Sequence, residues 1–149
     1  MTFEIPEPLK VEHEALHADL VEAIRAGGRV GAAAQAVADV LHPHFVREEE
    51  IAMPPLALLE PLAAGRVTPE MASALEMTDA LKAELPRMLA EHGRIVKALE
   101  ALADAGRAEA RPEIVAFAEK LMLHAQVEEK VLYPASILVG EYLKARLGR

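Results

Sequence analysis

Apolar residues recur along most of the chain at intervals of three and four positions, which is the period of an α-helix. Glycine and proline divide this pattern into separate stretches, because both residues favour helix ends over helix interiors. Four long helices are therefore predicted, at residues 9–25, 32–53, 68–103 and 112–133. A short helix at 56–62 is also predicted, as is a looser helical tail from Pro134 to residue 147.

Local signals mark the ends of these helices. Gly27 and Gly28 follow the first helix, where glycine commonly ends one. The third helix begins at Thr68, which offers a capping hydroxyl, and Pro86 inside it is expected to produce a kink. Four long helices with short connections predict an all-α protein, an up-down-up-down four-helix bundle. At 149 residues, a single domain spanning 1–149 is expected.

One phrase of eleven residues occurs twice, in the second and fourth predicted helices. It reads HFVREEEIAMP from His44 and HAQVEEKVLYP from His124, and the two copies match at the His, both Glu, an aliphatic position and the final Pro. The copies lie 80 residues apart, since 124 − 44 = 80. In each copy a Glu follows the His by four residues, so both side chains lie on one helix face, one turn apart.

The repeat extends to the first and third helices, which share a Glu-His pair at His13 and His92, 92 − 13 = 79 residues apart. We therefore expect residues 9–62 and 88–143 to be two copies of one helical hairpin, related by a pseudo-two-fold axis. Each copy supplies one His from its first helix and a His with a Glu from its second.

The four apolar stripes contain polar residues where a core is expected. Each stripe carries a His, two carry a Glu, and none carries Lys or Arg. A buried carboxylate without a partner costs several kcal/mol, so it pairs, binds a metal or becomes protonated. Two divalent cations would satisfy all six groups if the two Glu bridged them; the predicted metal ligands are His13, His44, Glu48, His92, His124 and Glu128. The metal-free alternative is a core of imidazolium–carboxylate pairs or neutral histidines.

Neighbouring residues give further candidates. His17 lies one turn after His13 and is a potential additional ligand, with a position at the rim of the site as the alternative. His42 should point away from His44. Glu49 and Glu129 are rotated about 100° from the ligand Glu, which suits a partner of the ligands or a position on the helix flank. The positions before the matched prolines, Met53 and Tyr133, are expected to pack the end of the bundle.

Composition narrows the classes of function. The chain has no Cys, so a metal site must use imidazole and carboxylate groups. A net charge of −8 with interspersed signs offers no basic patch for nucleic acid or anionic lipid. No apolar run is long enough for a membrane span, and the first residues do not resemble a signal peptide. A cytoplasmic location, with no nucleic-acid or membrane partner, is therefore expected.

With its HxxxEE…P phrase used twice and its two EHxx(L/I) helix openings, the sequence resembles the hemerythrin-like HHE cation-binding family over almost the whole chain. The resemblance implies a non-haem di-iron centre in which Glu48 and Glu128 bridge the irons. It further implies that His13 and His44 bind one iron while the other is bound by His92 and His124.

Two features depart from the oxygen-carrying hemerythrins. Those proteins have two histidines one turn apart on the third helix, whereas Met88 and Val96 flank His92 here. They also use one Glu and one Asp as bridges, whereas both are Glu in this chain. These departures argue against an oxygen carrier of the invertebrate type.

The leading hypothesis is a di-metal protein, with iron as the expected metal, that reversibly binds or senses O2, NO or iron itself. Zn and Mn also suit nitrogen and oxygen ligands. A di-iron oxidase or peroxidase is the second hypothesis, because it would use the same metal positions. A metal-free helical interaction module is the third.

Overall fold

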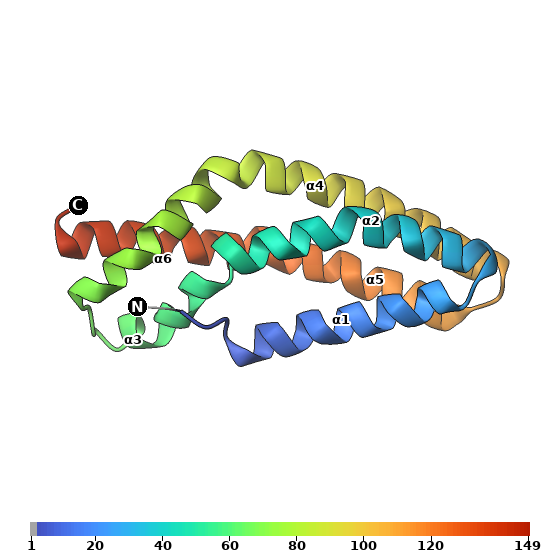
Figure 1. Cartoon of the computed structure of the whole chain (residues 1–149), viewed down its shortest axis with the longest axis horizontal. Coiled ribbons are helices and arrows are strands. Elements are labelled where there is room, and N and C mark those ends of the chain that lie inside the picture. The colour runs from blue at the N-terminus through green and yellow to red at the C-terminus, as the bar shows by residue number, and fades with distance from the viewer. Residues whose placement is uncertain (1–2) are drawn as a thin grey trace.

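The computed structural model describes residues 3–149, and every regular element within them is helical. Four helices run side by side and form the bundle, with successive helices antiparallel (Figure 1). Their bounds are α1 (Glu7–Arg25), α2 (Gly28–Ile51), α4 (Leu75–Ala108) and α5 (Pro112–Val127). The predicted all-α four-helix bundle is confirmed.

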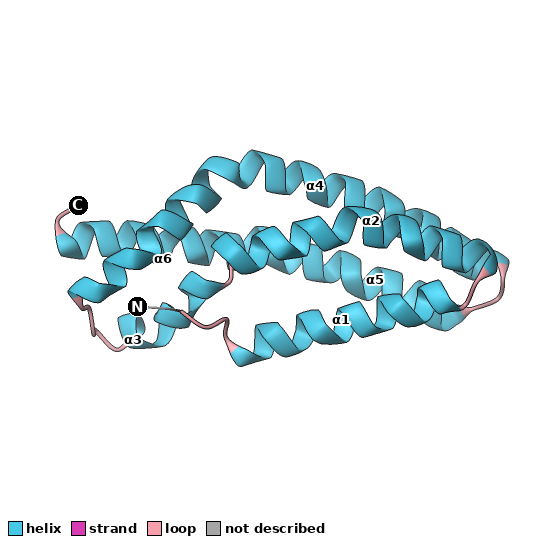
Figure 2. Cartoon of the chain, in the orientation of Figure 1, coloured by secondary structure: helices cyan, strands magenta, loops and turns pink. Residues whose placement is uncertain are grey.

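Shorter elements close one end of the bundle. After α2 the chain forms a 3₁₀ segment, α3 and a second 3₁₀ segment before α4 begins, and loops occupy only the turns and chain ends (Figure 2). After α5 a π-helical segment leads directly into α6, which packs on α4 and on both 3₁₀ segments. The bounds are Pro54–Leu58, α3 (Leu59–Ala63), Pro69–Ala74, Glu128–Leu132 and α6 (Tyr133–Leu147).

Several helix ends differ from the prediction. The second helix begins four residues early, because Gly27 and Gly28 both adopt positive φ, 68° and 59°, and reverse the chain at once. The third begins as a 3₁₀ segment and reaches Ala108 rather than residue 103. Gly106 continues this helix: an added Cβ there would lie 3.1 Å from the Ile114 side chain, so glycine permits close packing on α5.

The prolines inside helices have different effects. The helix α4 bends in its N-terminal half, which contains Pro86, as the predicted kink requires (Figure 1). Pro54 lies where α2 has ended. Its repeat partner Pro134 was expected to begin a looser tail, but it is the second residue of the regular helix α6. The π-helical segment before it lets the chain continue without a break.

The core consists of apolar layers on both sides of a polar layer. On α2, buried Leu41 and Ile51 flank buried His44 and Glu48. On α4, buried Met88 and Ile95 flank His92. Leu121 on α5 and Tyr133 at the start of α6 flank His124 and Glu128 in the same way. The polar layer therefore lies inside the bundle, between two hydrophobic clusters. None of the helices in residues 3–149 has the length and apolar character needed to cross a membrane.

Close packing between α4 and α6 should depend on Gly140. A Cβ at this position would lie 2.2 Å from Thr78 Oγ1, so Gly140→Ala forces the helices apart. We expect this change to lower the free energy of unfolding by about 1–3 kcal/mol in chemical denaturation. Gly93→Ala is the matched control, because a Cβ at Gly93 meets nothing within 4 Å and alanine favours the helix. Equal stability of both variants would contradict the packing account.

Candidate metal centre

The six predicted ligands meet in the polar layer. Each is buried, with no side chain more than 5% exposed. Helix periodicity explains the convergence, because each polar residue occupies the inward stripe of its own helix. Two groups of potential ligand atoms form, and within each group the atoms lie within 4.8 Å of one another: His44, Glu48, His92 and Glu128, and His13, His124 and Glu128.

The first group joins α2 to α4. Its two imidazoles approach closely, with 2.8 Å between the Nε2 atoms of His44 and His92. Glu48 Oε1 lies 2.5 Å from His44 Nε2, and Glu128 Oε1 lies 3.3 Å from His92 Nε2. Two nitrogens and an oxygen from each carboxylate therefore face one point.

The second group joins α1 to α5. Glu128 Oε2 lies 3.1 Å from His124 Nε2 and 3.6 Å from His13 Nε2. Glu48 also reaches this side, since its Oε2 lies 3.7 Å from His13 Nε2. Each carboxylate thus directs one oxygen to each group, which is the arrangement that a bridge between two cations needs.

The histidines pair differently from the pairing that the resemblance implied. It placed His13 with His44 and His92 with His124, whereas the structure groups His44 with His92 and His13 with His124. Helix adjacency alone does not decide this grouping, because α1 also packs on α2 and α4 also packs on α5. The imidazole directions decide it: the His44 ring approaches that of His92, and the His13 ring approaches that of His124. We describe the groups below as the His44–His92 side and the His13–His124 side.

A ring of four outer carboxylates holds the histidines. Each imidazole faces the interior with Nε2 and meets a Glu from a different helix with Nδ1. Glu49 and Glu129 have this role, as one of their two predicted positions allowed. Glu12 and Glu91 share it; the sequence marked them only as the first residues of the repeated Glu-His pairs. The Nδ1-to-Oε1 distances are 3.3 Å for His13–Glu49, 2.9 Å for His44–Glu91, 2.9 Å for His92–Glu129 and 2.6 Å for His124–Glu12.

These outer contacts determine which atoms face inward. A carboxylate accepts a hydrogen bond, so each Nδ1 carries a proton, and a neutral imidazole then directs the Nε2 lone pair to the interior. The interior therefore gathers hydrogen-bond acceptors. Buried atoms with no hydrogen-bond partner include His13 Nε2, His124 Nε2, both oxygens of Glu48 and Glu128 Oε2. A cation is the partner that these atoms share, so the residues fit a bound metal.

Without a metal, the carboxylates hold protons on the imidazoles. Burial lowers the pKa of His92, but the Glu128 and Glu48 carboxylates outweigh it and raise the pKa to about 10. Burial also lowers the pKa of His124, but the Glu128 and Glu12 carboxylates outweigh it and raise this pKa to about 9. Burial and the adjacent charge of Glu128 raise the pKa of the Glu48 carboxyl.

Tyr133 was expected to pack the end of the bundle, and this expectation is incomplete. Its side chain is fully buried, but its hydroxyl lies 3.2 Å from His44 Nε2 and 3.1 Å from His92 Nε2. In a regular α-helix, Tyr133 would lie roughly 140° around the axis from Glu128, five residues away at about 100° each. The Tyr133 N–H instead donates to the Glu128 carbonyl, and this wider π turn returns Tyr133 toward the Glu128 face.

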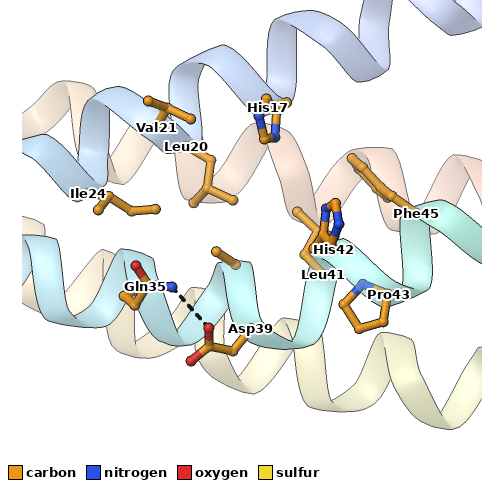
Figure 3. Close-up of a pocket in the computed structure, with 11 residues that line it drawn as sticks. His17, Leu20, Val21, Ile24, Gln35, Asp39, Leu41, His42, Pro43 and Phe45 are labelled. Atoms are coloured by element: carbon orange, nitrogen blue, oxygen red, sulfur yellow. Dashed lines mark hydrogen bonds between the residues drawn. The ribbon is translucent and has the colours of Figure 1, made fainter.

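His17, the additional candidate ligand, lies outside both groups. It is exposed, and with exposed His42 it lines a cavity of about 390 Å³ between α1 and α2 (Figure 3). Phe45 lines the same cavity and covers the metal centre on this side. Its ring stacks on the His13 imidazole with 4.1 Å between centroids and a 6° interplanar angle.

Comparison with known proteins agrees with this geometry. Searches of curated proteins and of solved structures each give no match. The family model described as the hemerythrin HHE cation binding domain matches residues 4–136, which include all six candidate ligands and the four outer carboxylates. The chain therefore belongs to the hemerythrin HHE cation-binding domain family.

Proposed function

We propose that this protein holds two iron ions in its polar layer and uses them to bind or sense a small diatomic molecule, O2 or NO. The observation that carries the proposal is the buried interior of acceptor atoms. In residues 3–149, the ion pairs of Glu48 and Glu128 are all with histidines, whose Nδ1 atoms already face other carboxylates.

The donor set favours iron. Four imidazole nitrogens and four carboxylate oxygens shared between two ions give each ion a mixed nitrogen and oxygen environment. This is the environment of di-iron carboxylate centres in helical bundles, where paired Glu and His side chains project inward. Zn is also bound by such ligands, but it is usually four-coordinate, whereas iron commonly takes more ligands.

Ligand number supports a role in binding small molecules. Two histidines and one oxygen from each bridging Glu supply about four protein ligands per ion, which is fewer than the six of an octahedral site. When bound, the iron pair supplies redox-active coordination positions for an exogenous ligand. Burial of every candidate ligand to 5% exposure or less restricts that ligand to a small molecule.

Metal content gives the first test. Protein reconstituted anaerobically with Fe²⁺ should retain about two iron ions per chain. His44→Ala and Glu128→Gln should each retain far less, because each removes a buried donor atom that no neighbour replaces. His42→Ala is the matched control, because His42 is exposed and lies only two residues from His44 on the same helix. Metal analysis after desalting measures the retention.

The same experiment can contradict the proposal. Wild-type protein that remains clearly sub-stoichiometric after anaerobic reconstitution would exclude a di-iron centre. Loss of iron in His42→Ala to the same extent as in His44→Ala would place the metal elsewhere.

Metal binding should release protons. The pKa of His92 at about 10 and that of His124 at about 9 mean that both imidazoles carry an extra proton near neutral pH without metal. A metal requires the Nε2 lone pair, so apparent affinity rises with pH until these pKa values are passed. Titration calorimetry in two buffers of different ionisation enthalpy measures the release. Equal heats in both buffers would show that no proton leaves.

Oxygen exposure distinguishes binding from catalysis. We expect the reduced di-iron protein to change its visible absorption in air and to return to the starting spectrum when O2 is removed. Sustained O2 consumption with an electron donor, without a recoverable spectrum, would support an oxidase instead. His44→Ala serves as the control for absorption that arises from loosely bound iron.

A further inference from the structure

We propose that Tyr133 is a positioning residue whose hydroxyl donates a hydrogen bond to a diatomic ligand on the His44–His92 side of the metal centre. The ligand then binds on this side in preference to the His13–His124 side. This inference rests on the proposed function, because it requires iron and a diatomic ligand in the polar layer.

The hydroxyl loses its present partners when a metal binds. In the structure it lies 3.2 Å from His44 Nε2 and 3.1 Å from His92 Nε2, the two lone pairs that would bind the cation. A nitrogen that binds a metal no longer accepts a hydrogen bond. The Tyr133 side chain is fully buried, and a buried hydroxyl without an acceptor is strongly disfavoured.

A ligand on the metal would supply the missing acceptor. A diatomic ligand on iron held by His44 and His92 would carry partial negative charge, which the Tyr133 hydroxyl could stabilise by donating a hydrogen bond. The hydroxyl already lies within hydrogen-bond distance of both Nε2 atoms on this side. The hydroxyl therefore faces the place that a small ligand on this side would occupy.

The repeat shows that this donor is specific to one side. Met53 occupies the position that corresponds to Tyr133, since 133 − 53 = 80. Its N–H donates to the Glu48 carbonyl at 2.9 Å, as the Tyr133 N–H does to the Glu128 carbonyl, so both copies have the same wide turn. Both side chains are buried, but only tyrosine brings a hydroxyl.

The His13–His124 side has an apolar cover instead. The Phe45 ring stacks on His13 and meets the His124 ring edge-on, with 6.1 Å between the latter centroids. A phenyl ring donates no conventional hydrogen bond to a bound ligand. The two sides therefore offer similar metal ligands but different surroundings, and the Tyr133 hydroxyl lies on the His44–His92 side.

Nitric oxide is the probe for the test. Wild-type and Tyr133→Phe proteins are loaded anaerobically with iron and exposed to NO, and the N–O stretching vibration and NO dissociation rate are recorded. We expect Tyr133→Phe to retain wild-type iron content, to shift the vibration and to release NO roughly tenfold faster, the effect of one hydrogen bond to a charged acceptor. Met53→Leu, the matched control, should leave both properties at wild-type values.

A second measurement needs no variant. Exchange of wild-type protein into D2O should shift a vibration of the NO adduct, because the donated proton becomes a deuteron. If Tyr133→Phe fails to fold or to take up iron, the absence of this shift in the wild-type protein would still overturn the hydrogen bond, and its presence would support it.

The outcomes separate this inference from the function on which it rests. Wild-type protein that takes up no iron, or that binds iron but no NO, overturns both. Normal NO binding with no D2O shift and no change in Tyr133→Phe overturns only the role of Tyr133. A change in Phe45→Leu without one in Tyr133→Phe places the ligand on the other side. A visible charge-transfer band that Tyr133→Phe abolishes would make Tyr133 a metal ligand and overturn its role as a donor.

Discussion

Burial of two carboxylates inside a helical bundle is the constraint on which the rest of this structure depends. Glu48 and Glu128 lie in the middle of the core, where an unpaired negative charge would be prohibitively unfavourable. Within residues 3–149, the ion pairs of both carboxylates are with histidines, and the outer carboxylates already contact the Nδ1 side of each imidazole. The centre of the bundle therefore favours positive charge, and two metal cations would supply it with one set of ligands.

The repeat makes the ligands symmetric but leaves their surroundings unequal. The contact His13–Glu49 within the first copy corresponds to His92–Glu129 within the second, and His44–Glu91 and His124–Glu12 are corresponding contacts between the copies. The residues around them differ: Met53 corresponds to Tyr133, and Phe45 to Ala125, since 125 − 45 = 80. A duplicated hairpin can thus build a two-metal site at once, and later differences can assign separate tasks to its two sides.

Sequence periodicity was sufficient to predict the bundle and the helix face on which each candidate ligand lies, because helix geometry relates the spacing of residues to the direction of their side chains. It could not reveal how the imidazoles group in the polar layer, where the structure brings His44 to His92 and His13 to His124 instead of the pairing implied by the family resemblance. Glu12 and Glu91 were recognised only as part of the repeated Glu-His pairs, and their role was missed because each contacts a histidine of another helix. Tyr133 was misjudged because a π turn changes the angle per residue, and single-sequence patterns assume a constant one.

The predicted bounds of the helices were the other source of error, because a proline in the sequence does not by itself show whether a helix ends there or continues. Paired prolines end the first copy of the phrase, whereas the single Pro134 is absorbed into α6. The consequence reaches the polar layer, because α6 continues directly from the π turn that brings Tyr133 to the histidines.

X-ray diffraction from iron-loaded crystals, with anomalous data at the iron absorption edge, tests the central claim most directly. The account predicts two anomalous peaks in the polar layer, bridged by Glu48 and Glu128, with His44 and His92 on one ion and His13 and His124 on the other. A single peak, or iron bound at exposed residues while the six buried side chains stay in their metal-free contacts, would contradict it.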